Sequence, residues 1–479
     1  MSHNITRFDP ERIADLSVKL IMAAGNNDVV EMERLRKNGA DIDFKADVTF
    51  GAGAICFNAR GFYEPKSPAN ALIAALHNGA FDAAMYLVKA GADLTFSRKS
   101  EIGNRDEKAL DFLIMDQVRE SVHNAHRSMP DFDSFLKDAF DATASARRHK
   151  NYQTDLYTSQ QRVQLFDAMV ANMQAKALDP IGIVSKHTML ETVHWGRAEM
   201  IPKLAGIGVK TEDWHFVEAA HPIHREDKAI ATMAAVLPYV KDVNVVDHSG
   251  FNAGHTAARQ FDLPAFQWLE QRGLNKTAVA GREGEWGGNN MPTYAHAVAF
   301  TTGYGKSKSK DAKDFAQYLV DQHYPLNMAN PHNLNMTPAE TALRESRIEI
   351  GLTYINGGAE VKPEFLKSAL WGQHYGNPPI PLLFQLIDKM EERGALTQEA
   401  MHMAFDVIAT RMTWNSERNG PDVRPVLQKI LDKGLALNPE NQQVAKRILA
   451  GESLTQPDEF DTPIRSTRQP SMRPPTKNL

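Results

Sequence analysis

The chain contains 479 residues, of which 54 are Lys or Arg and 59 are Asp or Glu, together with a single cysteine. Its formal net charge of −5 lacks the basic excess that is typical of general nucleic-acid-binding proteins. The single cysteine excludes an internal disulfide framework and favours a cytoplasmic location. No apolar run approaches the ~20 residues that a membrane-spanning helix needs, so we expect no membrane span.

The N-terminal residues 1–11 are expected to form a short arm, because they lack the apolar core of a secretory signal. From residue 12 to about 445, one pattern recurs: an amphipathic helix ends at a glycine or small residue, and an extended segment follows. Copies of this pattern lie at 34–43, 86–95, 203–211, 268–275, 318–327, 353–361, 389–397 and 429–438. Because glycine readily adopts the positive φ that ends a helix, the series predicts a stack of helical hairpins.

The first helix of a hairpin is predicted where Ser-Pro or Thr-Pro precedes small residues. Ser67-Pro68 and Thr337-Pro338 are examples, because the hydroxyl can cap a helix and proline suits its first turn. The second helix carries apolar side chains at helical spacing, as Phe266 and Leu269 do.

One copy follows the pattern D-x-x-G-x-T-P-L-H-x-A-A at Asp247, Gly250, His255, Ala257 and Ala258, with Asn252-Ala253-Gly254 in place of Thr-Pro-Leu. Further matches are Thr337, Pro338 and Ala342 with Glu340 in place of His, Ser67-Pro68 with Ala71-Leu72, and the turns Gly39-Ala40-Asp41 and Gly91-Ala92-Asp93. These segments resemble the ankyrin repeat family. The resemblance implies a mainly all-α, helical-hairpin solenoid with projecting β-hairpin loops.

The spacing of the turn glycines departs from the family's period of about 33 residues. Gly208 and Gly273 are 65 residues apart, which fits two units with a glycine-free turn between them. Gly273 and Gly358 are 85 residues apart, which fits two units and an insertion, with His323 at the glycine position. Gly91 and Gly208 are 117 residues apart, which fits three degenerate units or two units and a large insertion. We expect nine or ten units over residues 12–445.

Four segments interrupt the pattern and are predicted insertions, near 45–66, 119–160, 280–290 and 301–312. The first is expected to lengthen a projecting hairpin, and the second to form a loop with a short helix. The last residues, 451–479, are rich in Pro, Ser and Thr and net basic beyond Asp461, so we expect a disordered tail. Such a tail either solubilises the protein or carries a partner motif or an export signal.

We expect no catalytic, metal or cofactor site. His248 and His255 fall within the repeat pattern, and the resemblance implies that His255 makes a hydrogen bond near its helix start. A zinc site would need three or four converging ligands. The Gly-Lys-Ser at 305–307 lacks the first glycine of a phosphate loop, because Phe300 stands there. Cys56 has no base beside it in the sequence.

The resemblance implies a non-catalytic scaffold, acting as a monomer, that binds partner proteins through its hairpin tips and concave face. The repeat register places the candidate partner-binding residues near hairpin tips: Phe62, Tyr63, Asp247, His248, Glu285, Trp286, Asn330 and Asn335. Four further tryptophans lie on predicted helices and are assigned to the core, namely Trp195, Trp214, Trp268 and Trp371.

Two alternatives stay open. An enzyme, or the targeting subunit of one, would hold its chemistry in residues 119–186, whose polar side chains form no recognisable catalytic set. Alternatively, divergent ankyrin arrays with basic tails resemble bacterial effectors, which are delivered into the cytosol of a host cell and target a host protein.

Overall fold

The computed structural model describes residues 10–48, 67–99, 106–114, 156–222, 228–280, 292–300, 309–331, 333–371, 380–414 and 422–452. The described part is mainly helical, which confirms the predicted fold class. The chain divides into two compact units, residues 1–297 and 298–479. The repeat pattern in the sequence does not mark this division, and each unit is described by itself.

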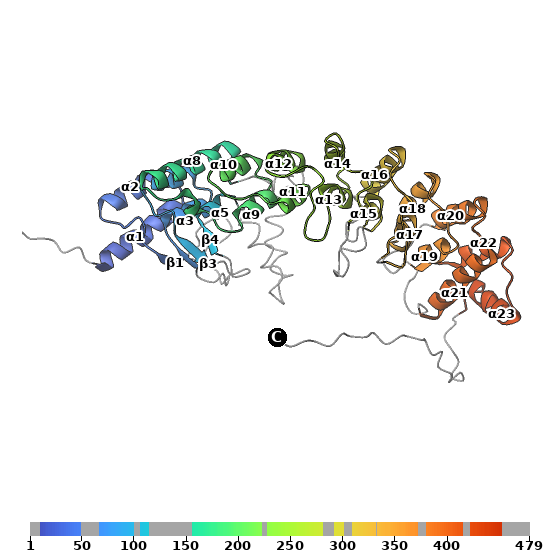
Figure 1. Cartoon of the computed structure of the whole chain (residues 1–479). Coiled ribbons are helices and arrows are strands. Elements are labelled where there is room, and N and C mark those ends of the chain that lie inside the picture. Colours follow the sequence, from blue (N-terminus) through green and yellow to red (C-terminus); the bar gives the residue numbers. More distant parts are fainter. Residues whose placement is uncertain are drawn as a thin grey trace, which may run out of the picture. The chain divides into compact units, whose positions relative to one another are not determined.

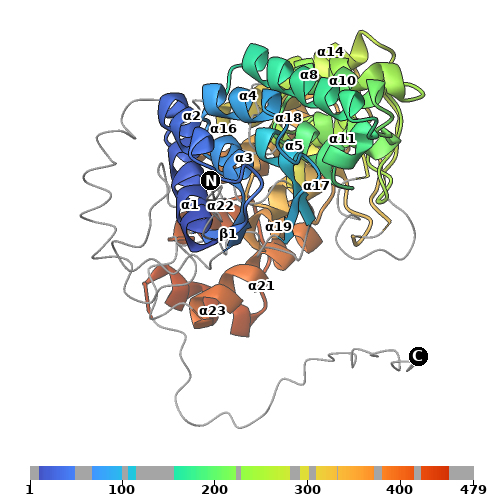
Figure 2. The same cartoon turned by 90° about the vertical axis from the view of Figure 1, so that its left-hand side faces the viewer.

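In the first unit, the helices alternate between two rows along the chain. The first row contains α1 (Pro10–Gly25), α3 (Ala71–His77), α5 (Ala109–Ile114), α9 (Thr188–His194), α11 (Asp213–Ala219) and α13 (Ala253–Gln260). The second row contains α2 (Val29–Lys37), α4 (Phe81–Lys89), α8 (Ser159–Ala175), α10 (Ile201–Gly206), α12 (Ala229–Val236) and α14 (Leu263–Glu270). Successive helices of the first row pack against each other, as α9 does against α5 and α11 (Figures 1 and 2). The short 3₁₀ turns are η1 (Pro180–Ile183), η2 (Ala198–Met200) and η4 (Leu237–Tyr239).

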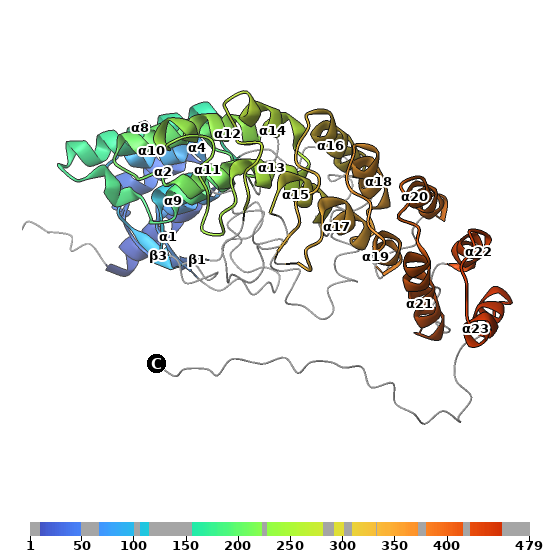
Figure 3. The same cartoon turned by 45° about the vertical axis from the view of Figure 1, so that its right-hand side comes forward.

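The second unit repeats this arrangement (Figure 3). One row contains α16 (Ser309–Asp321), α18 (Ile348–Asn356), α20 (Ile380–Glu392) and α22 (Arg424–Asp432). The other row contains α17 (Pro338–Arg344), α19 (Phe365–Trp371), α21 (Gln398–Trp414) and α23 (Pro439–Leu449). Neighbours in each row pack against one another, so both units are solenoids of helical hairpins. The remaining helix, α15 (Tyr294–Phe300), contains the boundary between the units.

The predicted turn positions have the left-handed backbone that ends each hairpin. These residues, with positive φ, are Gly39, Gly91, Gly208, Gly273, Gly358, Gly394 and Gly434. His323 takes the same conformation at φ 59°, as predicted from its register, and Ala177 does so at φ 54°. Ala177 follows α8, so the described part of the interval from Gly91 to Gly208 contains one further turn between these two glycines.

A recurring hydrogen bond joins consecutive turns within each unit. The acceptor is a side-chain oxygen of the residue four positions after one turn residue. The donor is the backbone N–H of the residue two positions after the next turn glycine. The pairs are Asp43 with Asp93 at 2.6 Å, Asn244 with Asn275 at 2.7 Å, Asn327 with Glu360 at 2.8 Å and Gln398 with Ala436 at 3.0 Å. Because each bond satisfies a backbone donor of the neighbouring hairpin, it fixes the spacing of the stack.

The helix start predicted at Ser67-Pro68 is wrong. Residues Ser67–Ala69 form strand β2, which pairs antiparallel with β1 (Ala46–Val48). Helix α3 begins at Ala71, because the Asn70 side chain caps it by accepting from the backbone N–H of Ile73 at 2.9 Å. By contrast, Thr337 caps α17 with Pro338 in the first turn, as predicted.

Strands β1 and β2 pair on either side of the predicted first insertion, of which residues 49–66 lie outside the described residues. A second hairpin, formed by β3 (Ser97–Lys99) and β4 (Asp106–Lys108), has no counterpart in the sequence prediction. The arm expected at 1–11 lies outside the described residues except for Pro10 and Glu11, which begin α1. The helix expected near 131–140 and the tail expected at 451–479, apart from its first two residues, also lie outside them. In the described part of the chain, no helix is long and apolar enough to cross a membrane.

Candidate functional site

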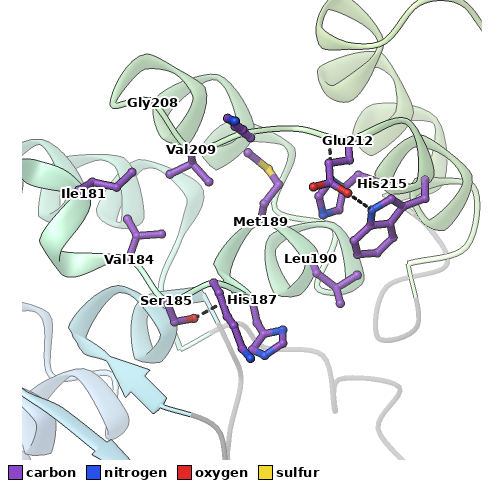
Figure 4. A pocket seen from close by; sticks show the side chains of 13 residues that line it. Ile181, Val184, Ser185, His187, Met189, Leu190, Gly208, Val209, Glu212 and His215 are labelled. Carbon is purple, nitrogen blue, oxygen red and sulfur yellow. Dashed lines mark hydrogen bonds between the residues drawn. The ribbon is translucent and has the colours of Figure 1, made fainter.

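A pocket of about 360 Å³ opens between the ends of α9 and α11 in the first unit (Figure 4). Met189 and Leu190 line it from α9, and Val209 and Glu212 line it from the segment that leads into α11. Its other lining residues are Ile181, Val184, Ser185, Lys186, His187, Gly208, Lys210, Trp214 and His215. The volume lies at the lower end of the range for ligand pockets, which is roughly 300–1,000 Å³.

The segment that precedes α9 forms one wall of the pocket, and hydrogen bonds to a buried carboxylate hold it in place. Asp111 of α5 is 2% exposed, and its side chain accepts from the Thr188 hydroxyl at 2.5 Å and from the Ser185 hydroxyl at 3.1 Å. The backbone N–H of Lys108 donates to the same carboxylate at 2.9 Å. These bonds tie the pocket segment to the preceding hairpin.

Burial raises the pKa of Asp111 to about 6, although the hydrogen bonds to its carboxylate act in the opposite direction. The folded-state pKa lies above the ordinary value of 3.8. This group's contribution to stability is therefore fully present below that ordinary value and is lost as the pH rises through about 6.

We predict that Asp111→Asn removes part of the pH dependence of stability. Between about pH 5 and about pH 7.5, the wild-type chain should lose on the order of 1 kcal/mol of unfolding free energy that the variant retains. Urea unfolding of both chains across this range, followed by circular dichroism, measures the difference. Parallel pH profiles for the two chains would contradict the assignment.

The other wall of the pocket is formed by the N-terminal cap of α11, in which Glu212 and His215 are hydrogen-bonded to each other. The His215 Nδ1 accepts from the backbone N–H of Glu212 at 2.9 Å, and the Trp214 indole N–H donates to the Glu212 carboxylate at 2.5 Å. Burial lowers the pKa of His215 to about 4, so its imidazole is neutral near pH 7. The Trp214 and His215 rings lie 4.0 Å apart, and Trp214 is half-buried. Trp214 and His215 both line the pocket, so the cap forms part of its wall.

The next turn along the chain lies beside this cap. Val246 and Asn252 form an antiparallel bridge, and the Asp247 carboxylate accepts from the backbone N–H groups of Ser249 and Phe251, both at 2.9 Å. His248 is exposed at this turn, with its ring 6.0 Å from that of Trp214. The structure thus brings the predicted turn residues close to the pocket.

His255 is a structural residue, as the resemblance implies. It is 2% exposed, and its Nδ1 lies 2.8 Å from the side-chain oxygen of Asn252, which caps α13. Its Nε2 lies 3.3 Å from the carbonyl of Pro292, and its ring lies 4.6 Å from that of Tyr294. Burial lowers the pKa of His255 to about 4. In the described part of the chain, no three His, Cys, Asp or Glu side chains form a group that could hold a metal ion.

In the second unit, a second turn contains Asn330 and Asn335. Asn335 is exposed and has φ 54°, next to Leu334, whose side chain is 77% exposed. Asn330 is fully buried, and its backbone N–H donates to Met336 at 2.8 Å. Its expected place on the contact surface is therefore wrong, because the residue closes the base of the turn.

The other predicted contact residues, Phe62, Tyr63, Glu285 and Trp286, lie outside the described residues, as does Cys56. Assigning the four helix tryptophans to the core is right for Trp195, which is 2% exposed, and wrong for Trp371, which is 47% exposed. Trp214 and Trp268 are half-buried. Trp214 is the site residue that the sequence reasoning missed.

Comparison with known proteins adds little to this geometry. No family model matches the chain, and no curated protein matches it. A crystal structure of an ankyrin repeat domain from Acinetobacter baumannii aligns with 71% of this chain and 98% of its own, at 13% identity and a TM-score of 0.24. A likeness this weak supports no argument about the site.

Proposed function

We propose that the protein is a non-catalytic scaffold that binds a partner protein, with the α9–α11 pocket as an anchor point. The observation that carries this proposal is the half-buried Trp214, held by Glu212 at the pocket and adjoined by His248 of the next turn. Tryptophans fixed in this way are common anchors of protein interfaces. The solenoid supports the reading because each hairpin adds one turn to a continuous surface.

The polar groups nearest the pocket favour a structural role over a catalytic one. The Ser185 and Thr188 hydroxyls both donate to Asp111, and Thr188 and Asp111 are buried. A nucleophile needs a base that is itself oriented towards a substrate site, whereas this carboxylate joins two helices of the stack. Catalysis within residues 119–186 remains the second candidate, and residues 119–155 lie outside the described residues.

Trp214→Ala should weaken capture of a partner from cell lysate while the chain stays folded. Trp268→Ala is the matched control, because Trp268 is also half-buried but lies on α14, under the guanidinium of Arg272 at 3.8 Å. Mass spectrometry of proteins retained by the tagged wild-type chain and by both variants measures the effect. Equal loss in the two variants, or no loss in Trp214→Ala, would contradict the proposal.

A second contact surface at Phe62 and Trp286 stays a prediction from the sequence alone. Since neither residue lies in the described part of the chain, the double alanine variant provides an independent arm of the same capture experiment. Delivery into a host cell as an effector is a further hypothesis about the biology of the scaffold.

A further inference from the structure

Two lysines line the α9–α11 pocket, and neither has an anionic partner among the described residues. Lys186 precedes α9 and Lys210 precedes α11; both are exposed, and both line the pocket. Among the described residues, neither ammonium group forms an ion pair or a hydrogen bond. By contrast, Lys203 on neighbouring α10 bonds to Asp167 at 2.8 Å. The lining therefore carries two cations that form no ion pair within the described part of the chain.

The acidic side chains of the pocket and of the adjacent turn already accept hydrogen bonds. Glu212 is the single carboxylate among the lining residues, and it accepts the indole N–H of Trp214. The Asp247 carboxylate, in the adjacent turn, accepts two backbone N–H groups of that turn. These hydrogen bonds leave the charge of both carboxylates in place, but the lining residues carry two ammonium groups against one carboxylate, and this excess of positive charge favours a ligand with negative charge.

About half of the lining of this pocket is apolar, and the other half is polar. Val184 and Met189 are buried at its wall, and Leu190 and Val209 are half-buried beside them. Such a lining gains free energy when an apolar group displaces water from it. A ligand that fits the whole site therefore combines one apolar group with carboxylates on either side of it.

We propose that the pocket binds an acidic peptide segment, with one apolar side chain in the pocket and flanking carboxylates at Lys186 and Lys210. This inference rests on the proposed scaffold function and names the chemistry of the partner segment. A peptide fits better than a small carboxylate because the two lysines belong to different segments of the lining, one before α9 and one before α11. An extended chain can place separate carboxylates near both cations while one side chain enters between them.

Fluorescence polarisation with labelled peptides tests this directly on the full chain. The probe is an acetylated peptide with Phe between two Asp-Asp pairs, compared with one in which Ala replaces Phe and one in which Asn replaces every Asp. The acidic Phe peptide should bind about tenfold more tightly than either comparison peptide, and its affinity should fall as salt rises.

Lys186→Glu combined with Lys210→Glu should weaken the acidic Phe peptide by about tenfold and improve binding of the same peptide with Lys in place of Asp. The control is Lys89→Glu with Lys367→Glu, which makes the same change in net charge at two exposed lysines on α4 and α19. This control should bind the acidic peptide as the wild type does.

Three outcomes would overturn the inference: no binding of the acidic Phe peptide, equal binding of the Asn peptide, or equal losses in the two double variants. None of these outcomes affects the scaffold proposal, which fails if partner capture is insensitive to Trp214→Ala or falls equally in Trp268→Ala.

Discussion

Glu199→Ala is expected to lower the free energy of unfolding by about 3 kcal/mol, because it removes a carboxylate that compensates a buried guanidinium. Glu199 lies in η2, and its carboxylate accepts from Arg162 Nε of α8 at 2.8 Å. The Arg162 side chain is 2% exposed, so water cannot replace the lost carboxylate. The bond joins two consecutive hairpins, and its loss should weaken their interface.

The matched control is a second ion pair on the same two hairpins. Lys203 of α10 contacts Asp167 of α8 at the same distance of 2.8 Å, but the two side chains are 37% and 52% exposed. Asp167→Ala should therefore cost at most about 1 kcal/mol. Urea unfolding followed by circular dichroism compares the two variants. Equal losses would show that the burial of Arg162 has no energetic consequence.

A double variant separates charge burial from simple loss of a contact. Adding Arg162→Met to Glu199→Ala removes the buried cation and keeps an apolar side chain of similar length. We expect the double variant to regain most of the stability lost in Glu199→Ala, since apolar replacement of a whole buried pair is often neutral. A double variant less stable than Glu199→Ala would contradict this account.

Gly357→Ala should destabilise the second unit by about 2 kcal/mol through overpacking. Gly357 follows the last turn of α18, and its φ of −77° suits any residue. A Cβ added there would lie 2.5 and 2.6 Å from the two γ carbons of Val320 on α16. Because a β-branched side chain has few rotamers, Val320 cannot turn aside without moving the helix.

Gly206→Ala is the control for this prediction. Gly206 ends α10, has no positive φ, and an added Cβ there meets no atom within 4 Å. Alanine should be neutral or slightly stabilising at this position, because it reduces the freedom of the unfolded chain. Comparable losses of melting temperature in both variants would mean that contact with Val320 is not the cause.

The sequence predicted the stack of hairpins because its signal is local. A glycine with positive φ after an amphipathic helix needs no partner elsewhere in the chain, so Gly273 and Gly358 marked their turns correctly. His323 could be placed by register alone, although its side chain disfavours that conformation. Ser67-Pro68 failed because strand pairing with β1 overrode a local helix-start pattern.

The pocket was not predictable in the same way. Its walls come largely from the segments that precede α9 and α11. These helices begin 25 residues apart in the sequence, at Thr188 and Asp213, and the two segments meet only because α9 packs against α11. Trp214 fits an amphipathic helix pattern and was assigned to the core, yet its indole turns to Glu212 at the helix start. By contrast, Asp247 and His248 were placed near a turn because the repeat register is local there.

Anchoring of a partner protein at the α9–α11 pocket is best tested by the affinity of a captured partner for three purified chains. Isothermal titration calorimetry would compare wild type, Trp214→Ala and Trp268→Ala. We predict that Kd rises by at least about tenfold for Trp214→Ala and stays within about twofold for Trp268→Ala. A Kd that is unchanged in Trp214→Ala, with the variant folded, would contradict the claim.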